Sequence, residues 1–283
     1  MRRALNLVVI LVLLAGCEPV DVVNALTSTK SIQSIETFAY GDKPRQQLDI
    51  YAPRVAKDAA PILLFIHGGG WDSGDKGDYK FLAEAFTSAG YHVVVPNYRL
   101  YPDVIYPEIV ADAAQALAWT ATYFSGQSII VMGHSAGAHS ALMLGLETPF
   151  LGSHGIDRCN TIAGVIGLAG PYGAVPLTQH KHIKIFPERF MGRDAPLNNV
   201  SAKVPPILLA TGLADETVYP KNSVELAAAL EAAEAAVELI TYPDLDHVDV
   251  VKLLSHFFVD DGPVKTDLLR FMAARDGISG PFC

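Results

Sequence analysis

A serine between two glycines is the first group in this sequence that could carry chemistry. The stretch GHSAG at residues 133–137 follows the apolar run 129–132 directly and precedes a helical pattern over 138–146. A serine on such a sharp strand-to-helix turn is forced outward, so its hydroxyl can attack a carbonyl carbon. We therefore expect Ser135 to be a nucleophile. The helix start favours the negative charge that develops on the carbonyl oxygen, and the backbone N–H of Ala136 is the natural first donor to it.

A run of glycines is the second candidate for the same chemistry. HGGGW at residues 67–71 closes the apolar run 62–66. Three consecutive glycines let backbone N–H groups converge on a small anion, and we expect those of Gly69 and Gly70 to complete an oxyanion hole. A phosphate-binding loop is the competing interpretation, but the sequence lacks both GK[ST] and a GxGxxG followed by an acidic residue.

Buried strands alternating with helices would position both motifs. Continuous apolar runs of this kind suit strands covered on both faces, as in a parallel sheet. They lie at residues 62–66, 93–95, 129–132, 162–168, 207–210 and 237–242. Between them, residues 107–124 and 223–236 have helical patterns, and residues 38–40 and 47–51 look like an antiparallel hairpin at one edge. The order predicts an α/β fold with a mostly parallel sheet. Residues 171–200 have little periodicity and predict a small lid excursion.

The two motifs, with PNYRL at residues 96–100, resemble the α/β-hydrolase superfamily. Within it they are similar to the HGGGW-bearing branch of hormone-sensitive-lipase-like and feruloyl-esterase-like carboxylesterases. The likeness runs from about Phe38 to Phe271. It implies the α/β-hydrolase fold, with helices on both faces of the sheet, and a serine hydrolase that cleaves carboxylic esters.

The resemblance also implies a catalytic triad in the chain order serine, acid, histidine. Asp215 follows the run 207–210 and His247 follows the run 237–242, so these two residues are the expected acid and base. His247 would take the proton of Ser135, and Asp215 would orient the imidazole. No metal or organic cofactor is required. The rival carboxylates near these positions are Glu216, Asp244, Asp246 and Asp249.

Two other functions remain open at this stage. The stretch GHSAGAH at residues 133–139 also resembles kynurenine formamidase, which would make the protein an arylformamidase-like amide hydrolase, although Gly70 departs from that family's pattern. A non-catalytic, surface-anchored binding lipoprotein is the alternative of another class. We expect a small-molecule or glycan-linked ester with a short acyl group, because a short excursion over 171–200 argues against a large lipase lid.

The N-terminus has the layout of an export signal. A basic start and about eleven apolar residues precede LAGC at residues 14–17, which resembles the lipobox of bacterial lipoproteins. The resemblance implies lipidation of Cys17 and, with Glu18 next, tethering to the outer membrane facing the periplasm. The lipid anchor would be the only membrane contact. In that oxidising compartment Cys159 and Cys283 could form a disulfide.

Composition sets the remaining limits. The chain has 283 residues, 50% of them hydrophobic, and a net charge of −9. That apolar content excludes intrinsic disorder, and the acidic balance argues against nucleic acid as a partner. We expect a signal peptide at 1–16, the lipidated cysteine and a linker at 17–33, and one catalytic domain at 34–283. The oligomeric state is not predicted.

Overall fold

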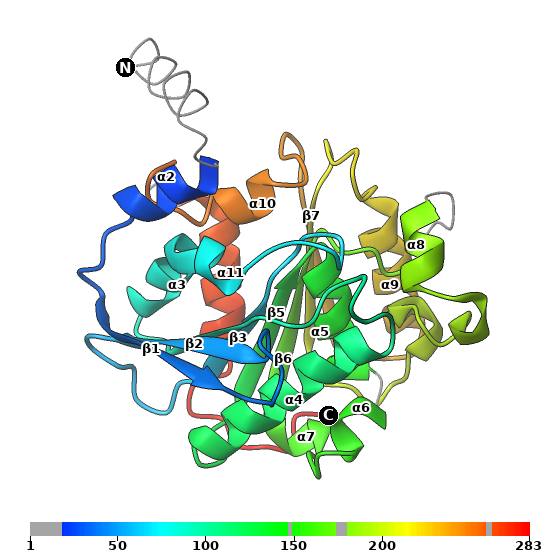
Figure 1. Ribbon diagram of the computed structural model, residues 1–283, viewed down its shortest axis with the longest axis horizontal. Helices are drawn as coiled ribbons and strands as arrows, with labels where there is room; N and C mark the ends of the chain where they lie inside the picture. Colours follow the sequence, from blue (N-terminus) through cyan, green and yellow to red (C-terminus); the bar gives the residue numbers. More distant parts are fainter. Residues whose placement is uncertain (1–18, 147–148, 174–179, 259–261) are drawn as a thin grey trace.

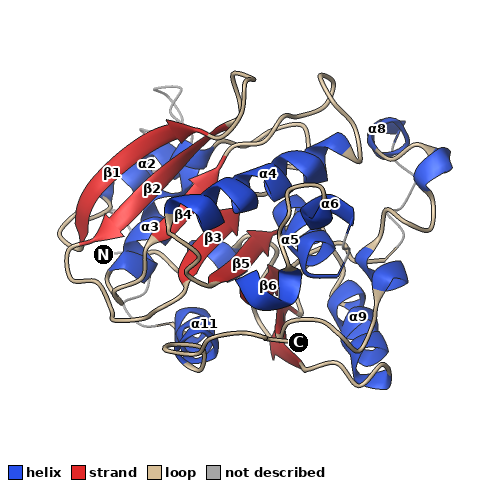
Figure 2. Ribbon diagram, turned by 90° about the horizontal axis from the view of Figure 1, so that it is seen from below, coloured by secondary structure: helices blue, strands red, loops and turns tan. Residues whose placement is uncertain are grey.

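A twisted eight-stranded sheet forms the centre of the molecule (Figures 1 and 2). The computed structural model describes residues 19–146, 149–173, 180–258 and 262–283. The strand order is β1-β2-β4-β3-β5-β6-β7-β8; β1 and β2 are antiparallel, β2 runs antiparallel to β4, and the other pairs are parallel. The strands are β1 (Ile32–Ala39), β2 (Gln47–Pro53), β3 (Ile62–Ile66), β4 (Val93–Pro96), β5 (Ile129–His134), β6 (Ile162–Leu168), β7 (Ile207–Gly212) and β8 (Val237–Tyr242). The predicted mostly parallel sheet and its edge hairpin are confirmed.

Helices cover both faces of this sheet, as expected. One face packs against α4 (Glu108–Tyr123), α5 (Ala136–Leu146) and α9 (Lys221–Ala232), and the other against α3 (Lys80–Thr87) and α11 (Pro263–Ala273). Strand β3 shows why its whole length is apolar. Leu64 contributes to the first core and its neighbours Leu63 and Phe65 to the second, and all three are fully buried.

Short helices and turns make up the connections. They are η1 (Lys76–Tyr79), α6 (Pro149–Gly152), α7 (Arg158–Thr161), α8 (His180–Ile185), η2 (Glu188–Phe190), η3 (Pro196–Asn199) and α10 (Asp249–Lys252). Residues 250–258 have apolar side chains at helical spacing, but the helix there is only the single turn of α10. His256 lies beyond it, where its Nε2 is 2.7 Å from the carboxylate of Glu84.

The N-terminal segment differs from the expected linker. Residues 19–26 form helix α2 (Pro19–Leu26), and β1 begins at Ile32. The side chain of Asn24 holds this helix by hydrogen bonds to backbone groups of Gly77 and Phe81. A linker was expected because eight mixed residues carry little periodicity, and partners more than fifty positions away are not visible in the local sequence. The signal residues 1–16 and Cys17 lie outside the described residues.

A disulfide joins Cys159, in α7, to Cys283. The pairing considered from the sequence is therefore present. Since α7 directly precedes β6, the disulfide lies near the amino end of that strand, opposite the carboxyl ends of the parallel strands. The backbone N–H of Phe282 donates a further hydrogen bond to the carbonyl of Cys159. Among helices in the described part of the chain, none is long and apolar enough to cross a bilayer.

Candidate active site

Ser135 lies on a tight turn between β5 and α5. Its φ is 54°, in the left-handed region that side chains rarely adopt, and its backbone N–H donates to the carbonyl of Leu168 at 2.9 Å. The flanking glycines are required by space. A Cβ at Gly137 would lie 2.0 Å from the carbonyl oxygen of Ile66, and one at Gly133 would lie 2.2 Å from the carbonyl oxygen of Gly137. The sequence motif thus forms the predicted strand-to-helix turn with the serine hydroxyl in a pocket.

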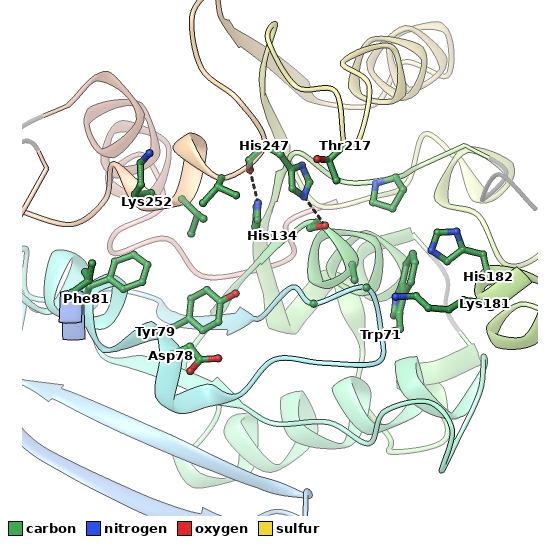
Figure 3. A pocket seen from close by; sticks show the side chains of 18 of the residues that line it. Trp71, Asp78, Tyr79, Phe81, His134, Lys181, His182, Thr217, His247 and Lys252 are labelled. Carbon is green, nitrogen blue, oxygen red and sulfur yellow. Dashed lines mark hydrogen bonds between the residues drawn. The ribbon is translucent and has the colours of Figure 1, made fainter. Parts of the chain in front are cut away.

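The structure brings the three expected residues of the triad together; Figure 3 shows His247 in the pocket, with its hydrogen bond drawn as a dashed line. His247 Nε2 is 2.9 Å from Ser135 Oγ, and His247 Nδ1 is 2.8 Å from Asp215 Oδ2. Because an ionised carboxylate only accepts hydrogen bonds, Nδ1 carries the proton and the lone pair of Nε2 faces the serine hydroxyl. This is the arrangement that general-base activation of a serine needs.

Asp215 is held as a carboxylate at the end of β7. It is 2% exposed, and its Oδ1 accepts the backbone N–H groups of Thr217 and Val218, each at 2.8 Å. Burial raises the pKa of this carboxyl, but the hydrogen bond from His247 and those from the two backbone N–H groups outweigh it and hold the pKa below its usual range.

The rival carboxylates occupy other positions. Glu216, Asp244 and Asp246 are exposed to solvent. Asp246 accepts the backbone N–H groups of Val248 and Asp249, each at 2.8 Å, which shapes the turn after the histidine.

His134 takes part in the site in a way that its motif did not reveal. Its Nε2 lies 2.8 Å from the backbone carbonyl oxygen of His247, and the two imidazole rings lie 4.9 Å apart. Burial, followed by the nearby His247, lowers the pKa of His134 to about 4. The neutral ring therefore donates its Nε2–H to that carbonyl. This bond joins residues 113 positions apart, so no local sequence signal could have indicated it.

The glycine loop lies beside the nucleophile. Gly69 and Gly70 have φ angles of 115° and 58°, and both line the pocket together with Ala136. Gly68 passes so close that a Cβ there would lie 3.3 Å from the Cβ of Ser135. The buried hydroxyl of Tyr98 holds the start of this loop by donating a hydrogen bond to the carbonyl of His67 at 2.9 Å.

The pocket around Ser135 has a volume of about 700 Å³. Trp71 lines it, whereas Tyr172 is fully buried in the core. His139 is buried, with its Nε2 2.6 Å from the carbonyl oxygen of Asp194, and does not line the pocket. Residues 171–200 contribute Pro171 and the side chains of Lys181 and His182, so the expected excursion forms part of one wall. Nowhere in the described ranges do three His, Cys, Asp or Glu side chains gather in a group that could hold a metal ion.

A parallel sheet with a serine on a strand-to-helix turn after its central strand defines an α/β-hydrolase. The comparison with protein families agrees with this class. The BD-FAE family model matches residues 48–230, and the chain belongs to that family.

Two kinds of enzyme name occur among the relatives of this chain. A protein of Oryza sativa named as a probable isoprenylcysteine alpha-carbonyl methylesterase is 30% identical over 247 residues, which is 78% of this chain and 59% of the relative. A kynurenine formamidase of Danio rerio is 26% identical over 255 residues, covering 86% of this chain and 83% of the relative. This chain thus spans less than two thirds of the methylesterase.

Solved structures show the same fold at low sequence identity. A truncated carbohydrate esterase from gut microbiota superimposes with a TM-score of 0.75 at 19% identity, covering 89% of this chain and 99% of the other. Esterase B of Lactobacillus rhamnosis superimposes with a TM-score of 0.76 at 21% identity, covering 91% and 90%. These similarities confirm the α/β-hydrolase fold predicted from the sequence motifs.

Proposed function

We propose that this protein is a serine hydrolase that cleaves carboxylic esters with short acyl groups. The observation that carries the proposal is the hydrogen-bonded chain from Ser135 Oγ through His247 to Asp215, which opens into a pocket beside the glycine loop. The names of the relatives support it, since a methylesterase and a formamidase both break a bond to a carbonyl carbon with water.

The reaction follows from this geometry in two halves. Ser135 Oγ attacks the ester carbonyl carbon while His247 Nε2 takes the hydroxyl proton, and the imidazolium then delivers that proton to the leaving alkoxide. The products of this half are the free alcohol and an acyl-serine. In the second half, water gives its proton to His247 and attacks the acyl carbon, and Ser135 leaves with the proton returned. The carboxylic acid is released and the enzyme is restored.

Backbone donors would stabilise both tetrahedral intermediates. The N–H groups of Gly69, Gly70 and Ala136 belong to residues that border the pocket around the nucleophile. Each such donor contributes about 3 kcal/mol to transition-state stabilisation in comparable sites. Asp215 would stabilise the positive charge on His247 during each proton transfer.

Cleavage of an N-formyl amide is a second candidate for the same residues. The formamidase relative favours it, because the alignment covers 83% of the formamidase but only 59% of the methylesterase. The same acyl-serine pathway serves an amide, with an amine as the leaving group in place of an alcohol. The substrate panel below includes both bond types.

The test is hydrolysis of p-nitrophenyl acetate, a feruloyl ester and N-formylkynurenine by the wild type and by Ser135→Ala. We expect turnover of at least one ester by the wild type and a loss of at least about a thousandfold in Ser135→Ala. Ser140→Ala is the matched control, since this buried serine lies in α5, the helix that follows Ser135, and bonds only weakly to the carbonyl of Ala136 at 3.4 Å. A wild type that is as inert as Ser135→Ala on every compound would instead support a binding lipoprotein.

We further propose that the chain is exported and tethered through a lipidated Cys17 to a bacterial membrane, facing the periplasm. The disulfide between Cys159 and Cys283 supports export, because such bonds persist in oxidising compartments. Cys17→Ser should move the protein from the membrane fraction to the soluble fraction. Unchanged partitioning would refute the tether.

A further inference from the structure

Helix α2 forms part of the pocket wall. The side chain of Val23 lines the pocket with Phe81 and Val251, and it packs against the core on that side of the sheet. Figure 1 shows α2 above α3, and the two helices are in contact. The segment before the first strand therefore contributes directly to the space in which a substrate would lie.

Asn24 fixes this helix in position. Its Nδ2 donates to the carbonyl of Gly77 at 2.9 Å, and its Oδ1 accepts the backbone N–H of Phe81 at 3.2 Å. Its own carbonyl accepts from Lys80 Nζ at 3.2 Å. Both ends of the side-chain amide are thus used by η1 and α3. Since Val23 is the preceding residue, these bonds hold its side chain at the pocket.

The pocket extends to two sides of the catalytic pair (Figure 3). Trp71, Lys181, His182 and Thr217 lie on one side, and Asp78, Tyr79, Phe81 and Lys252 lie on the other. We call the second side the apolar wing, because most of its lining is apolar although it includes the charged Asp78 and Lys252; its apolar and aromatic lining comprises Val23, Tyr79, Phe81, Val248, Val251 and Phe258. Apolar surface gains most from burial against apolar surface, so this wing matches the hydrocarbon acyl group of an ester.

We propose that the apolar wing binds the acyl group of the ester, that Val23 limits the length of acyl chain accepted, and that Asn24 is a positioning residue for Val23. This inference rests on the proposed esterase function. It makes the N-terminal segment a determinant of specificity, in addition to any role in tethering.

The first experiment measures kcat/KM of the full-length chain on p-nitrophenyl acetate, butyrate, hexanoate and octanoate. Val23→Trp should lower the ratio of hexanoate to acetate by about tenfold or more, since a bulky ring removes space for several methylenes. Val23→Ala should shift the preference toward octanoate. The control is Ala25→Trp, which places the same ring on an exposed position of the same helix and should leave the ratio unchanged.

The second experiment tests Asn24 through a conservative pair. Asn24→Leu removes both side-chain hydrogen bonds, so we expect KM for hexanoate to rise while kcat on acetate changes less. Asn24→Asp keeps an acceptor for the N–H of Phe81 and should restore part of the wild-type ratio. A merely structural role would lower activity on all four esters alike and would overturn the assignment of Asn24.

The outcomes separate this inference from the proposed function. If the wild type hydrolyses esters but the acyl preference of Val23→Trp equals that of the wild type, the apolar wing does not bind the acyl group. A shift seen only when the alcohol is lengthened in a series of acetate esters would place the alcohol there and overturn the proposal. A wild type inert toward every ester would instead refute the esterase function itself. Thermal unfolding of each variant shows that the fold is retained.

Discussion

His247 is held at two points, and both matter for its distance to the serine. Its Nδ1–H donates to Asp215, and its backbone carbonyl accepts from the buried His134. The first bond sets the tautomer, and the second fixes the loop that carries the ring. The side chain is only 12% exposed, so few water molecules compete for its ring nitrogens. Ring orientation is therefore determined by protein groups before any substrate binds.

Replacing the carboxylate tests this arrangement. In Asp215→Asn the amide cannot stabilise the imidazolium and no longer enforces the protonated Nδ1, so we expect kcat to fall by about four orders of magnitude with the fold retained. Steady-state kinetics and thermal unfolding measure the two quantities. Asp244→Asn, which alters an exposed rival carboxylate on the loop before His247, should keep normal turnover. If Asp215→Asn turned over normally, the acid would have to be another residue.

At the scale of elements, the position of Ser135 depends on how closely α5 approaches the sheet. The helix begins directly over the end of β3. A Cβ added at Gly137 would lie 2.0 Å from the carbonyl oxygen of Ile66 and 2.5 Å from that of His67. Backbone atoms of a central strand cannot move aside without disturbing their hydrogen bonds to both neighbours. The close contact thus determines the depth at which the serine lies.

Two glycines of α5 provide a matched comparison. Gly137→Ala should lower the free energy of unfolding by about 3 kcal/mol or more and reduce activity, because the helix must shift away from β3. The Cβ in Gly145→Ala would meet one methyl group of Val165 at 2.6 Å rather than two backbone oxygens, and alanine gains up to about 1 kcal/mol in helix propensity, so its cost should be smaller. Urea denaturation measures both. Equal losses would mean that helix α5 does not depend on this contact.

The elements were predictable from the sequence wherever burial dictated residue type. Each strand from β3 to β6 is completely buried, so its apolar run stood out, and the spacing of GHSAG fixed the turn after β5. Helix α2 was not predictable because its stability depends on Asn24 meeting η1 and α3. The apolar spacing over residues 250–258 looks helical, but α10 ends at Lys252, and His256 beyond it contacts the carboxylate of Glu84. In each case the contact is with residues distant in the chain.

At the scale of the whole molecule, three buried histidines link stability to pH. Burial lowers the pKa values of His67, His134 and His139 from the ordinary 6.5 to about 4. In the unfolded chain they would bind protons near pH 6.5, so between that pH and about 4 the unfolded state holds more protons than the folded one. Stability from these groups is therefore complete above pH 6.5 and is lost as the pH falls toward 4.

We expect the urea midpoint to decrease between pH 7 and pH 5, reversibly on return to neutral pH. Each buried histidine contributes a decrease in the free energy of unfolding of up to about 1.4 kcal/mol per pH unit as the pH falls from 6.5 toward 4. His139→Gln, which keeps an N–H donor for the carbonyl of Asp194, should make the decrease shallower. Midpoints that are equal at the two pH values would show that these histidines are accessible to protons in the folded state.

The disulfide between Cys159 and Cys283 closes a covalent loop that spans 124 positions. The proposed acid and base both lie within this loop, whereas Ser135 and the glycine loop precede it in the chain. Closing a loop of this length restricts the unfolded chain by an amount worth about 5 kcal/mol. Because the strands before and after Cys159 belong to one sheet, reduction would lower the free energy of unfolding of the whole domain. The distance between the nucleophile and its two partners would be lost only when that sheet unfolds.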